Sequence, residues 1–115
     1  LRDVKSLDKA IHMVKNKNYD SVISLYHDTR YLWKIKKNTT AIPTNYDPNN
    51  RMPRQKERWN QWAENKSIYV MKRDILFKKG RIGKKCGYVE MEKWRSVDID
   101  TFDDLKIARS LIDKI

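Results

Sequence analysis

The pattern of apolar and polar positions predicts short helices and strands along the chain. Between residues 5 and 17, apolar residues recur every three or four positions, which indicates an amphipathic helix with its apolar face at Val4, Leu7, Ile11 and Val14. Residues 21–26 form a β-prone, mostly apolar run typical of a buried strand. The alternation at 31–37 indicates a second, half-exposed strand.

The C-terminal part of the chain continues with the same kinds of element. Strands are predicted at 67–72 and 86–91, with a short helix at 73–80 that Gly80 ends. A further short strand is predicted at 96–100. Thr101 and Asp104 have the spacing of a capping box that begins the last helix, whose expected buried stripe is Leu105, Ala108, Leu111, Ile112 and Ile115. Helices that cover a sheet make this an α/β fold.

The segment from residue 38 to 58 lacks such periodicity and contains all three prolines of the chain, which predicts a long loop. Long loops in small domains are commonly functional or disordered. Arg51, Arg54 and Arg58 lie in it, with Gln55 beside them. Guanidinium groups bind carboxylates and phosphates with two parallel hydrogen bonds, so the loop is a candidate anion site. An exposed basic loop without a ligand is the alternative.

Asp98 and Asp100 alternate with Val97 and Ile99 in the predicted strand at 96–100. Residues two apart in a strand point to the same side, so the two carboxylates are expected side by side, with the apolar pair facing the core. Adjacent carboxylates repel unless a cation lies between them. Mg²⁺ or Mn²⁺ suits one or two carboxylates plus substrate phosphates, and two solvated charges are the alternative.

Composition restricts the possible partners and compartments. The chain has 115 residues, 26 Lys+Arg against 15 Asp+Glu, and a formal charge of +11, which favours an anionic partner such as nucleic acid, a membrane surface or a small anion. Six aromatic residues interleaved with basic ones could stack on nucleobases or form core: Tyr31, Trp33, Trp59, Trp62, Tyr69 and Trp94. The single cysteine, Cys86, is expected to be an inert core thiol in a cytoplasmic protein. No glycine-rich phosphate loop is present.

Four ordered motifs resemble the acylneuraminate cytidylyltransferases, the CMP-sialic acid synthetases. The ending RSVDIDTFDDLKIARSLI resembles that family's S-[IV]-D-I-D-x-x-x-D pattern, and NYDPNNRMPRQ resembles its N-x-x-P…R-x-x-R-Q loop. ENKSIYVMKRDIL resembles its E-N-G-[SA]-[IF]-Y segment, and the initial LR resembles the end of its P-T-S-P-L-R motif. The resemblance covers essentially all 115 residues and corresponds to the C-terminal half of the family's domain.

The resemblance implies a nucleotidyltransferase that joins CMP from CTP to an acidic nine-carbon sugar of the sialic acid type and releases pyrophosphate. It implies a mixed sheet of the nucleotide-diphospho-sugar-transferase, Rossmann-like kind with flanking helices. By resemblance, Asp98 and Asp100 hold the catalytic metal, while Arg51, Arg54 and Gln55 bind the sugar, Arg54 also being catalytic. Asn65 lies at the sugar site. A homodimer is implied, with the region of about 38–66 serving sugar binding and dimer contact and 96–115 forming the metal-binding strand and final helix.

Two features depart from the family pattern. Lys66 stands where the family has glycine, and a positive φ there would strain a lysine; Ala63 stands where some relatives have arginine. The N-terminal, CTP-binding half with its phosphate loop is absent from this chain, so we expect the chain alone to be inactive. A non-enzymatic basic module that binds nucleic acid, or a stand-alone dimerisation domain, remains the alternative function.

Overall fold

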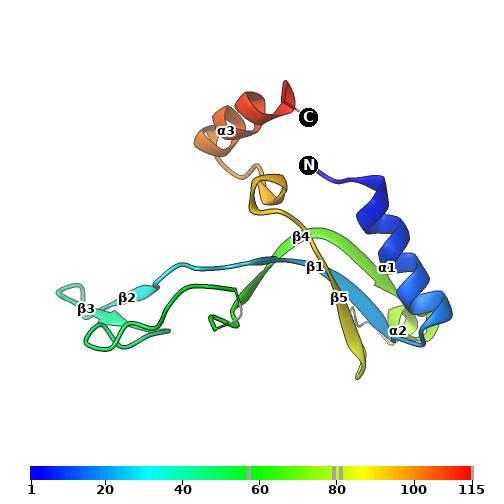
Figure 1. Cartoon of the computed structure of the whole chain (residues 1–115), viewed down its shortest axis with the longest axis horizontal. Helices are drawn as coiled ribbons and strands as arrows, with labels where there is room; N and C mark the ends of the chain where they lie inside the picture. Colours follow the sequence, from blue (N-terminus) through cyan, green and yellow to red (C-terminus); the bar gives the residue numbers. More distant parts are fainter. Residues whose placement is uncertain (57, 79, 81, 115) are drawn as a thin grey trace. The chain divides into compact units, whose positions relative to one another are not determined.

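A computed structural model describes residues 1–56, 58–78, 80 and 82–114, so Ile115 of the predicted helix stripe lies outside the described residues. Figure 1 shows the order of elements: α1 (Val4–Asn16), β1 (Ser21–His27), β2 (Trp33–Lys36), β3 (Thr40–Pro43), β4 (Trp62–Met71), α2 (Arg73–Phe77), β5 (Cys86–Glu90), the 3₁₀ turn η1 (Lys93–Ser96) and α3 (Phe102–Ile112). Two compact units result, one from residues 27–62 and one from residues 1–26 and 63–115.

The larger unit is built on a three-stranded mixed sheet in the order β4-β1-β5. β1 and β5 are parallel, with the register running from Ser21↔Cys86 to Leu25↔Glu90. Two hydrogen bonds show that β4 runs antiparallel to β1. The Lys72 amide, after the end of β4, donates to the Asp20 carbonyl, before the start of β1, and the Ile68 amide, four residues earlier, donates to the Ser24 hydroxyl, four residues later. The predicted α/β class with a mixed sheet and flanking helices is confirmed. Its assignment to the Rossmann-like nucleotidyltransferases stays a prediction.

Helix α1 begins where the sequence predicted it but buries a different face. Its N-cap is Asp3, whose carboxylate accepts from the amide and hydroxyl of Ser6 at 2.7 and 2.9 Å. The core contains Ala10 and, from the sheet, Val22, Ile68, Val89 and Met91, with Met13 and Val14 packed against it. The predicted apolar face is largely wrong, since Val4 is 73% exposed and Leu7 and Ile11 are each 43% exposed. The helix rotates so that its small Ala10 meets the sheet.

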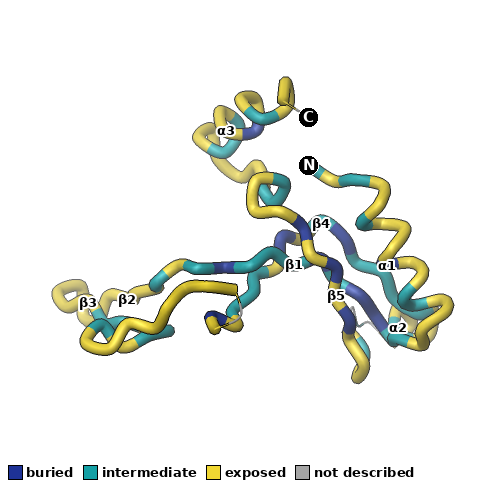
Figure 2. The backbone as a smooth tube through the Cα atoms, in the orientation of Figure 1, coloured by how far each residue is buried: buried dark blue, intermediate teal, exposed yellow. Residues whose placement is uncertain are grey.

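Strand β5 alternates between a buried and an exposed face (Figure 2). Gly87 and Val89 are buried, whereas Cys86 and Glu90 are exposed. A Cβ atom on Gly87 would lie 2.7 Å from the Tyr19 ring and 2.8 Å from the Met13 methyl group, so a larger residue here would displace these two side chains. The prediction of a buried Cys86 is wrong, because the period of two places Cys86 opposite the core.

The smaller unit contains a hairpin that the sequence pattern missed. Residues 40–43 of the predicted loop form β3, which pairs antiparallel with β2 from Trp33↔Pro43 to Lys36↔Thr40. Lys37 and Asn38, between the strands, both have positive φ, of 51° and 57°, and the Thr39 amide closes the turn on the Lys36 carbonyl at 3.2 Å. Turns with positive φ match the twist of hairpin strands. Asn38 therefore marks a hairpin turn rather than the beginning of a structureless loop.

The segment predicted as a strand at 96–100 is not a strand. Ser96 ends the 3₁₀ turn η1, and residues 97–101, which follow it, belong to no strand before α3 begins. The amides of Asp100 and Thr101 donate instead to the carboxylate of Asp104, at 3.1 and 3.0 Å. Ile99, expected to face the core, is 55% exposed. Backbone donors used by a helix cap are not available to a β ladder.

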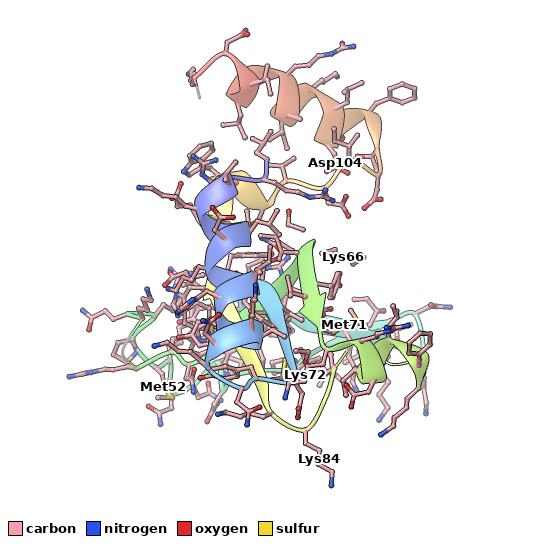
Figure 3. All side chains as sticks on the ribbon, turned by 90° about the vertical axis from the view of Figure 1, so that its right-hand side faces the viewer. Met52, Lys66, Met71, Lys72, Lys84 and Asp104 are labelled. Carbon is pink, nitrogen blue, oxygen red and sulfur yellow. The ribbon has the colours of Figure 1, made fainter. Side chains whose placement is uncertain are left out.

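Helix α3 begins as predicted. Thr101 is its N-cap and forms a complete capping box with Asp104, which Figure 3 labels at the start of this helix. Of the predicted stripe, Ala108 is buried and Leu105 and Leu111 are half-buried, while Ile112 is 55% exposed. None of the helices in the described part of the chain has the length and apolar character needed to cross a membrane.

The middle of β4 contains a residue in a left-handed conformation. Lys66, labelled in Figure 3, has φ of 59°. The positive φ that the family's glycine suggested is thus present, and residues other than glycine, asparagine and aspartate rarely adopt it. The strain that it would place on Lys66 stays a prediction. The Lys66 side chain is exposed, so it gains little from burial that could offset the strain.

Replacing Lys66 by glycine is expected to raise the free energy of unfolding by about 0.5–1 kcal/mol, since glycine adopts this φ without a steric penalty. Urea denaturation followed by circular dichroism measures the change. The matched control is Lys34→Gly on β2, which is exposed and has no positive φ and should lose stability. Equal losses in both variants would show that the backbone at residue 66 is not strained.

Candidate functional site

Two of the predicted sugar-binding arginines meet on one aromatic ring. The guanidinium carbon of Arg51 lies 5.6 Å from the centroid of the Tyr31 ring, and that of Arg54 lies 4.9 Å from it. Arg54 also donates to the Thr29 carbonyl at 3.4 Å, and the Tyr31 hydroxyl donates to the Met52 carbonyl at 3.3 Å. Cation–π contacts of this kind hold a guanidinium while leaving its N–H edge able to bind a ligand. The loop thus presents two cations together.

Tyr31 is itself part of an aromatic cluster. Its ring stacks on Tyr46 with centroids 4.1 Å apart, and it meets Trp59 edge-on at 5.6 Å. Trp33 contacts Tyr46 edge-on at 6.0 Å. Trp59 is only 6% exposed. These contacts favour the core interpretation of Tyr31 and Trp59 over nucleobase stacking, whereas Trp33 is 48% exposed.

Polar bonds around Asp28 hold the arginine-bearing loop to the rest of the smaller unit. The buried Asp28 carboxylate pairs with the Arg30 guanidinium at 2.8 and 3.1 Å, and this pairing, more than the Arg30 amide, holds the pKa of Asp28 below its usual value despite burial. The Asp28 carbonyl accepts from the Trp59 indole at 2.7 Å and from Gln61 at 3.3 Å. The hydrogen bond from the Trp59 indole to the Asp28 carbonyl therefore fixes the C-terminal end of the loop.

Gln55, the third predicted sugar-binding residue of this loop, has a backbone role in the structure. Its carbonyl accepts from the amides of Arg58 and Trp59 at 2.9 and 2.8 Å, which closes a turn. Arg58 lines a separate open hollow of about 190 Å³ together with Asn45, Met52, Trp59, Asn60 and Gln61. The roles of Gln55 and the arginines in binding sugar stay predictions.

Asn65 lies inside the larger unit, only 8% exposed. Its side-chain oxygen accepts from the Ser24 hydroxyl and from the Ser67 amide, the latter at 3.1 Å. Its amide nitrogen donates to the Ser96 hydroxyl at 3.1 Å and lies 3.3 Å from the Met91 sulfur. The amide group is therefore bonded to protein at both ends, and direct contact of Asn65 with a sugar stays a prediction.

Asp98 and Asp100 lie on the unpaired segment between η1 and α3, and both are exposed. Within the described ranges, neither carboxylate has a hydrogen bond or ion pair with the protein. Asp100 borders an open hollow of about 240 Å³ with Ile99, Thr101, Phe102 and Leu105. Among all the residues that the structure describes, no group of three or more His, Cys, Asp or Glu side chains is placed to hold a metal ion. This pair would leave most ligand positions on a cation to substrate or water.

Asp104 has a structural role, as the sequence analysis expected of its position. The hydrogen bond from the Asp100 amide, followed by those from Thr101, holds the pKa of the Asp104 carboxyl below its usual value. The cap therefore stays ionised near neutral pH, at the end of the helix where negative charge is favourable.

Sequence reasoning missed Tyr31 as the residue that gathers the arginines, and Ser24 and Ser96 as partners of Asn65. Each of these contacts joins residues at least 20 positions apart. Tyr31 is one of several aromatic residues among basic ones, and this pattern is the one sequence signal for its contact with the arginines. Nothing in the local pattern distinguishes Ser24 or Ser96 from other serines of the chain.

Comparisons with known proteins show that the chain is similar in sequence to two cytidylyltransferases. N-acylneuraminate cytidylyltransferase A from Danio rerio is 31% identical over 111 residues, covering 94% of this chain and 26% of the relative. N-acylneuraminate cytidylyltransferase from Oncorhynchus mykiss is 32% identical over 109 residues, covering 92% of this chain and 25% of the relative. No family model matches. The chain spans about a quarter of the length of the curated relatives it matches. The resemblance seen in the motifs is thereby confirmed: this chain is related to the N-acylneuraminate cytidylyltransferases over nearly its whole length.

Proposed function

We propose that this chain is the part of a cytidylyltransferase that binds an acidic nine-carbon sugar and a divalent cation during transfer of CMP from CTP. The observation that carries the proposal is the similarity to two N-acylneuraminate cytidylyltransferases over more than nine-tenths of the chain. The proposed architecture is the Rossmann-like nucleotidyltransferase fold, to which the mixed sheet β4-β1-β5 would contribute. The triphosphate would be bound by residues outside these 115, so the chain alone is expected to be inactive.

Arg51 and Arg54 would bind the carboxylate of the sugar. Both guanidinium groups lie over Tyr31, and two neighbouring cations attract an anion more strongly than either does alone. A guanidinium donates two parallel hydrogen bonds to a carboxylate. Holding both groups before the sugar arrives lowers the entropy that binding must lose. Gln55 would add a hydrogen bond to the sugar.

Asp98 and Asp100 would hold Mg²⁺ or Mn²⁺. The residues fit such an ion because both carboxylates are exposed and, among the residues described, bonded to nothing else. They are two apart on the short unpaired segment that joins η1 to α3. The bound cation would neutralise negative charge on the phosphates of CTP. The hollow beside Asp100 leaves room for a ligand next to that carboxylate.

The β2–β3 hairpin would form a homodimer contact. Trp33 is 48% exposed and Ile35 is 66% exposed, although both belong to a strand of a two-stranded sheet. Exposed apolar residues grouped on a strand indicate a protein partner. Ile35→Lys is therefore expected to shift the chain from dimer to monomer in sedimentation-velocity runs at equal concentration. Lys34→Glu, also exposed on β2, is the control that changes charge without removing an apolar side chain. A wild-type chain that sediments as a monomer contradicts the contact.

Binding of N-acetylneuraminic acid to the chain tests the sugar site directly, without CTP. Arg54→Ala is expected to weaken the affinity about tenfold or more, the value of a lost hydrogen bond between charged groups, as measured by chemical-shift titration. Arg73→Ala is the matched control, since Arg73 also lies over a ring, that of Phe77, at 5.2 Å. A neutral hexose serves as the second ligand and should not bind. Equal affinities for the Arg54 and Arg73 variants would remove the arginine pair from the proposal.

A further inference from the structure

The buried side chain of Asn65 connects the central strand of the sheet to the turn that precedes Asp98. The Ser67 amide can only donate, so the Asn65 atom that it contacts at 3.1 Å is the side-chain oxygen. The amide nitrogen must then face Met91 and Ser96. The orientation of the Asn65 side chain therefore follows from its surroundings.

The hydroxyl groups at the two ends of this connection have defined directions too. Ser24 on β1 accepts from the Ile68 amide at 2.9 Å and donates to the Asn65 oxygen. Ser96 accepts from Asn65 at 3.1 Å and donates to the Glu92 carbonyl at 3.0 Å. A directed chain of hydrogen bonds thus runs from β1 through Asn65 to the last residue of η1. No buried polar side-chain atom in the described part of the chain lacks a partner.

This chain of bonds ends two residues before Asp98. On the other side of the aspartate pair, the Asp104 carboxylate holds the amides of Asp100 and Thr101. The segment that carries the two aspartates has no strand pairing of its own. Besides the helix cap, it is anchored next to Asp98 by the Asn65 bond to Ser96 and by the bond from the Leu1 ammonium to the Arg95 carbonyl at 3.1 Å. The cap is local to α3, whereas the bond at Ser96 reaches the sheet.

We propose that Asn65 and Ser96 are positioning residues for the divalent cation. Their hydrogen bond would attach the segment bearing Asp98 and Asp100 to the sheet, so that the two carboxylates are held together before the cation binds. This inference rests on the proposed function, because it takes Asp98 and Asp100 as the ligands. Groups that orient metal ligands through hydrogen bonds commonly change metal affinity by tenfold or more when removed.

The test is the affinity of the chain for Mn²⁺, measured by electron paramagnetic resonance of the free ion. Ser96→Ala is expected to weaken Mn²⁺ binding about tenfold, and Ser96→Thr, which keeps the hydroxyl, is expected to restore it. Ser110→Ala is the matched control, because the Ser110 hydroxyl also donates to a backbone carbonyl nearby, that of Ile107 at 2.7 Å, in an exposed contact. This control should bind Mn²⁺ as the wild type does. Urea midpoints of the two alanine variants show whether both remain folded.

The outcomes separate the inference from the function on which it rests. If Asp98→Asn abolishes Mn²⁺ binding while folded Ser96→Ala binds as well as the wild type, the positioning role is wrong and the metal site stands. If Asp98→Asn binds Mn²⁺ as the wild type does, or if the wild type binds none, the metal site is wrong and the positioning role falls with it. If Ser96→Ala loses both its fold and Mn²⁺ binding, Ser96→Thr becomes the test variant. If Ser96→Thr is folded and does not bind Mn²⁺, the inference is also wrong.

Discussion

Replacing Asp100 by asparagine is expected to lower kcat for CMP transfer by about 100-fold or more, the usual effect of removing one preorganised electrostatic group from a transition state. The measurement uses a hybrid protein in which this chain replaces the matched segment of the Danio rerio relative. Pyrophosphate release from CTP and N-acetylneuraminic acid reports the rate. Asparagine keeps the size of the side chain and the Asp100 amide bond to Asp104, so the helix cap should be unaffected.

The matched control for Asp100→Asn is Asp103→Asn. Asp103 is exposed and lies in the first turn of α3, so its replacement removes the same charge a few residues away. It should change kcat less than about twofold. An active hybrid whose kcat does not change on Asp100→Asn contradicts the metal role of Asp100. If the wild-type hybrid does not fold, Mn²⁺ binding by the 115-residue chain decides the question, and Asp100→Asn should reduce it whereas Asp103→Asn should not.

Replacing Asn65 by alanine is expected to lower the free energy of unfolding by about 3 kcal/mol. The side chain is 8% exposed and bonds Ser24, Ser67 and Ser96. Its loss removes the acceptor of the buried Ser24 hydroxyl and of the half-buried Ser67 amide, and opens a small cavity between β1, β4 and η1. A buried group left without its partner costs about 1–3 kcal/mol, and a cavity adds to that cost. Urea denaturation at neutral pH measures the change.

The control for Asn65→Ala is Asn60→Ala. Asn60 is exposed and accepts one hydrogen bond, from the Trp62 indole at 3.0 Å, and its replacement should lower the free energy of unfolding by less than about 1 kcal/mol. If both variants lose equally little, the Asn65 side chain does not carry the bonds described above. A stable Asn65→Ala chain with weakened sugar binding would instead support the role that the family resemblance gives Asn65.

Local sequence signals identified much of the fold. The three-residue spacing from Thr101 to Asp104 predicted the capping box, and the apolar run at 21–26 predicted β1, since both depend on neighbouring residues alone. The prediction of a strand at 96–100 is wrong, and the reason is again a local hydrogen bond. Alternation in residues 97–100 predicts β pairing, but the amide of Asp100 donates to the Asp104 carboxylate four residues later. The Asp100 amide is therefore not available as a donor to a neighbouring strand.

Other errors came from orientation rather than from element type. The α1 helix was predicted, but the spacing of Val4, Leu7 and Ile11 could not show that the small Ala10 faces the sheet. The face of a helix that is buried depends on the surface against which the helix packs. Here Gly87 has no side chain, which leaves room for the side chains of Met13 and Tyr19. Likewise, Cys86 was predicted to lie in the core, but the alternation of β5 buries Gly87 and Val89 and leaves Cys86 on the exposed face.

The sequence by itself determined the family relationship and the two candidate groups of charged residues, because motifs and charge are visible along the chain. Only the tertiary structure decided that Arg51 and Arg54 share the Tyr31 ring and that Asn65 links Ser24 to Ser96. These contacts join residues that are 20 to 41 positions apart. They form because burial of the aromatic rings and of the Asn65 amide brings distant segments together, and no local pattern encodes which segments those are.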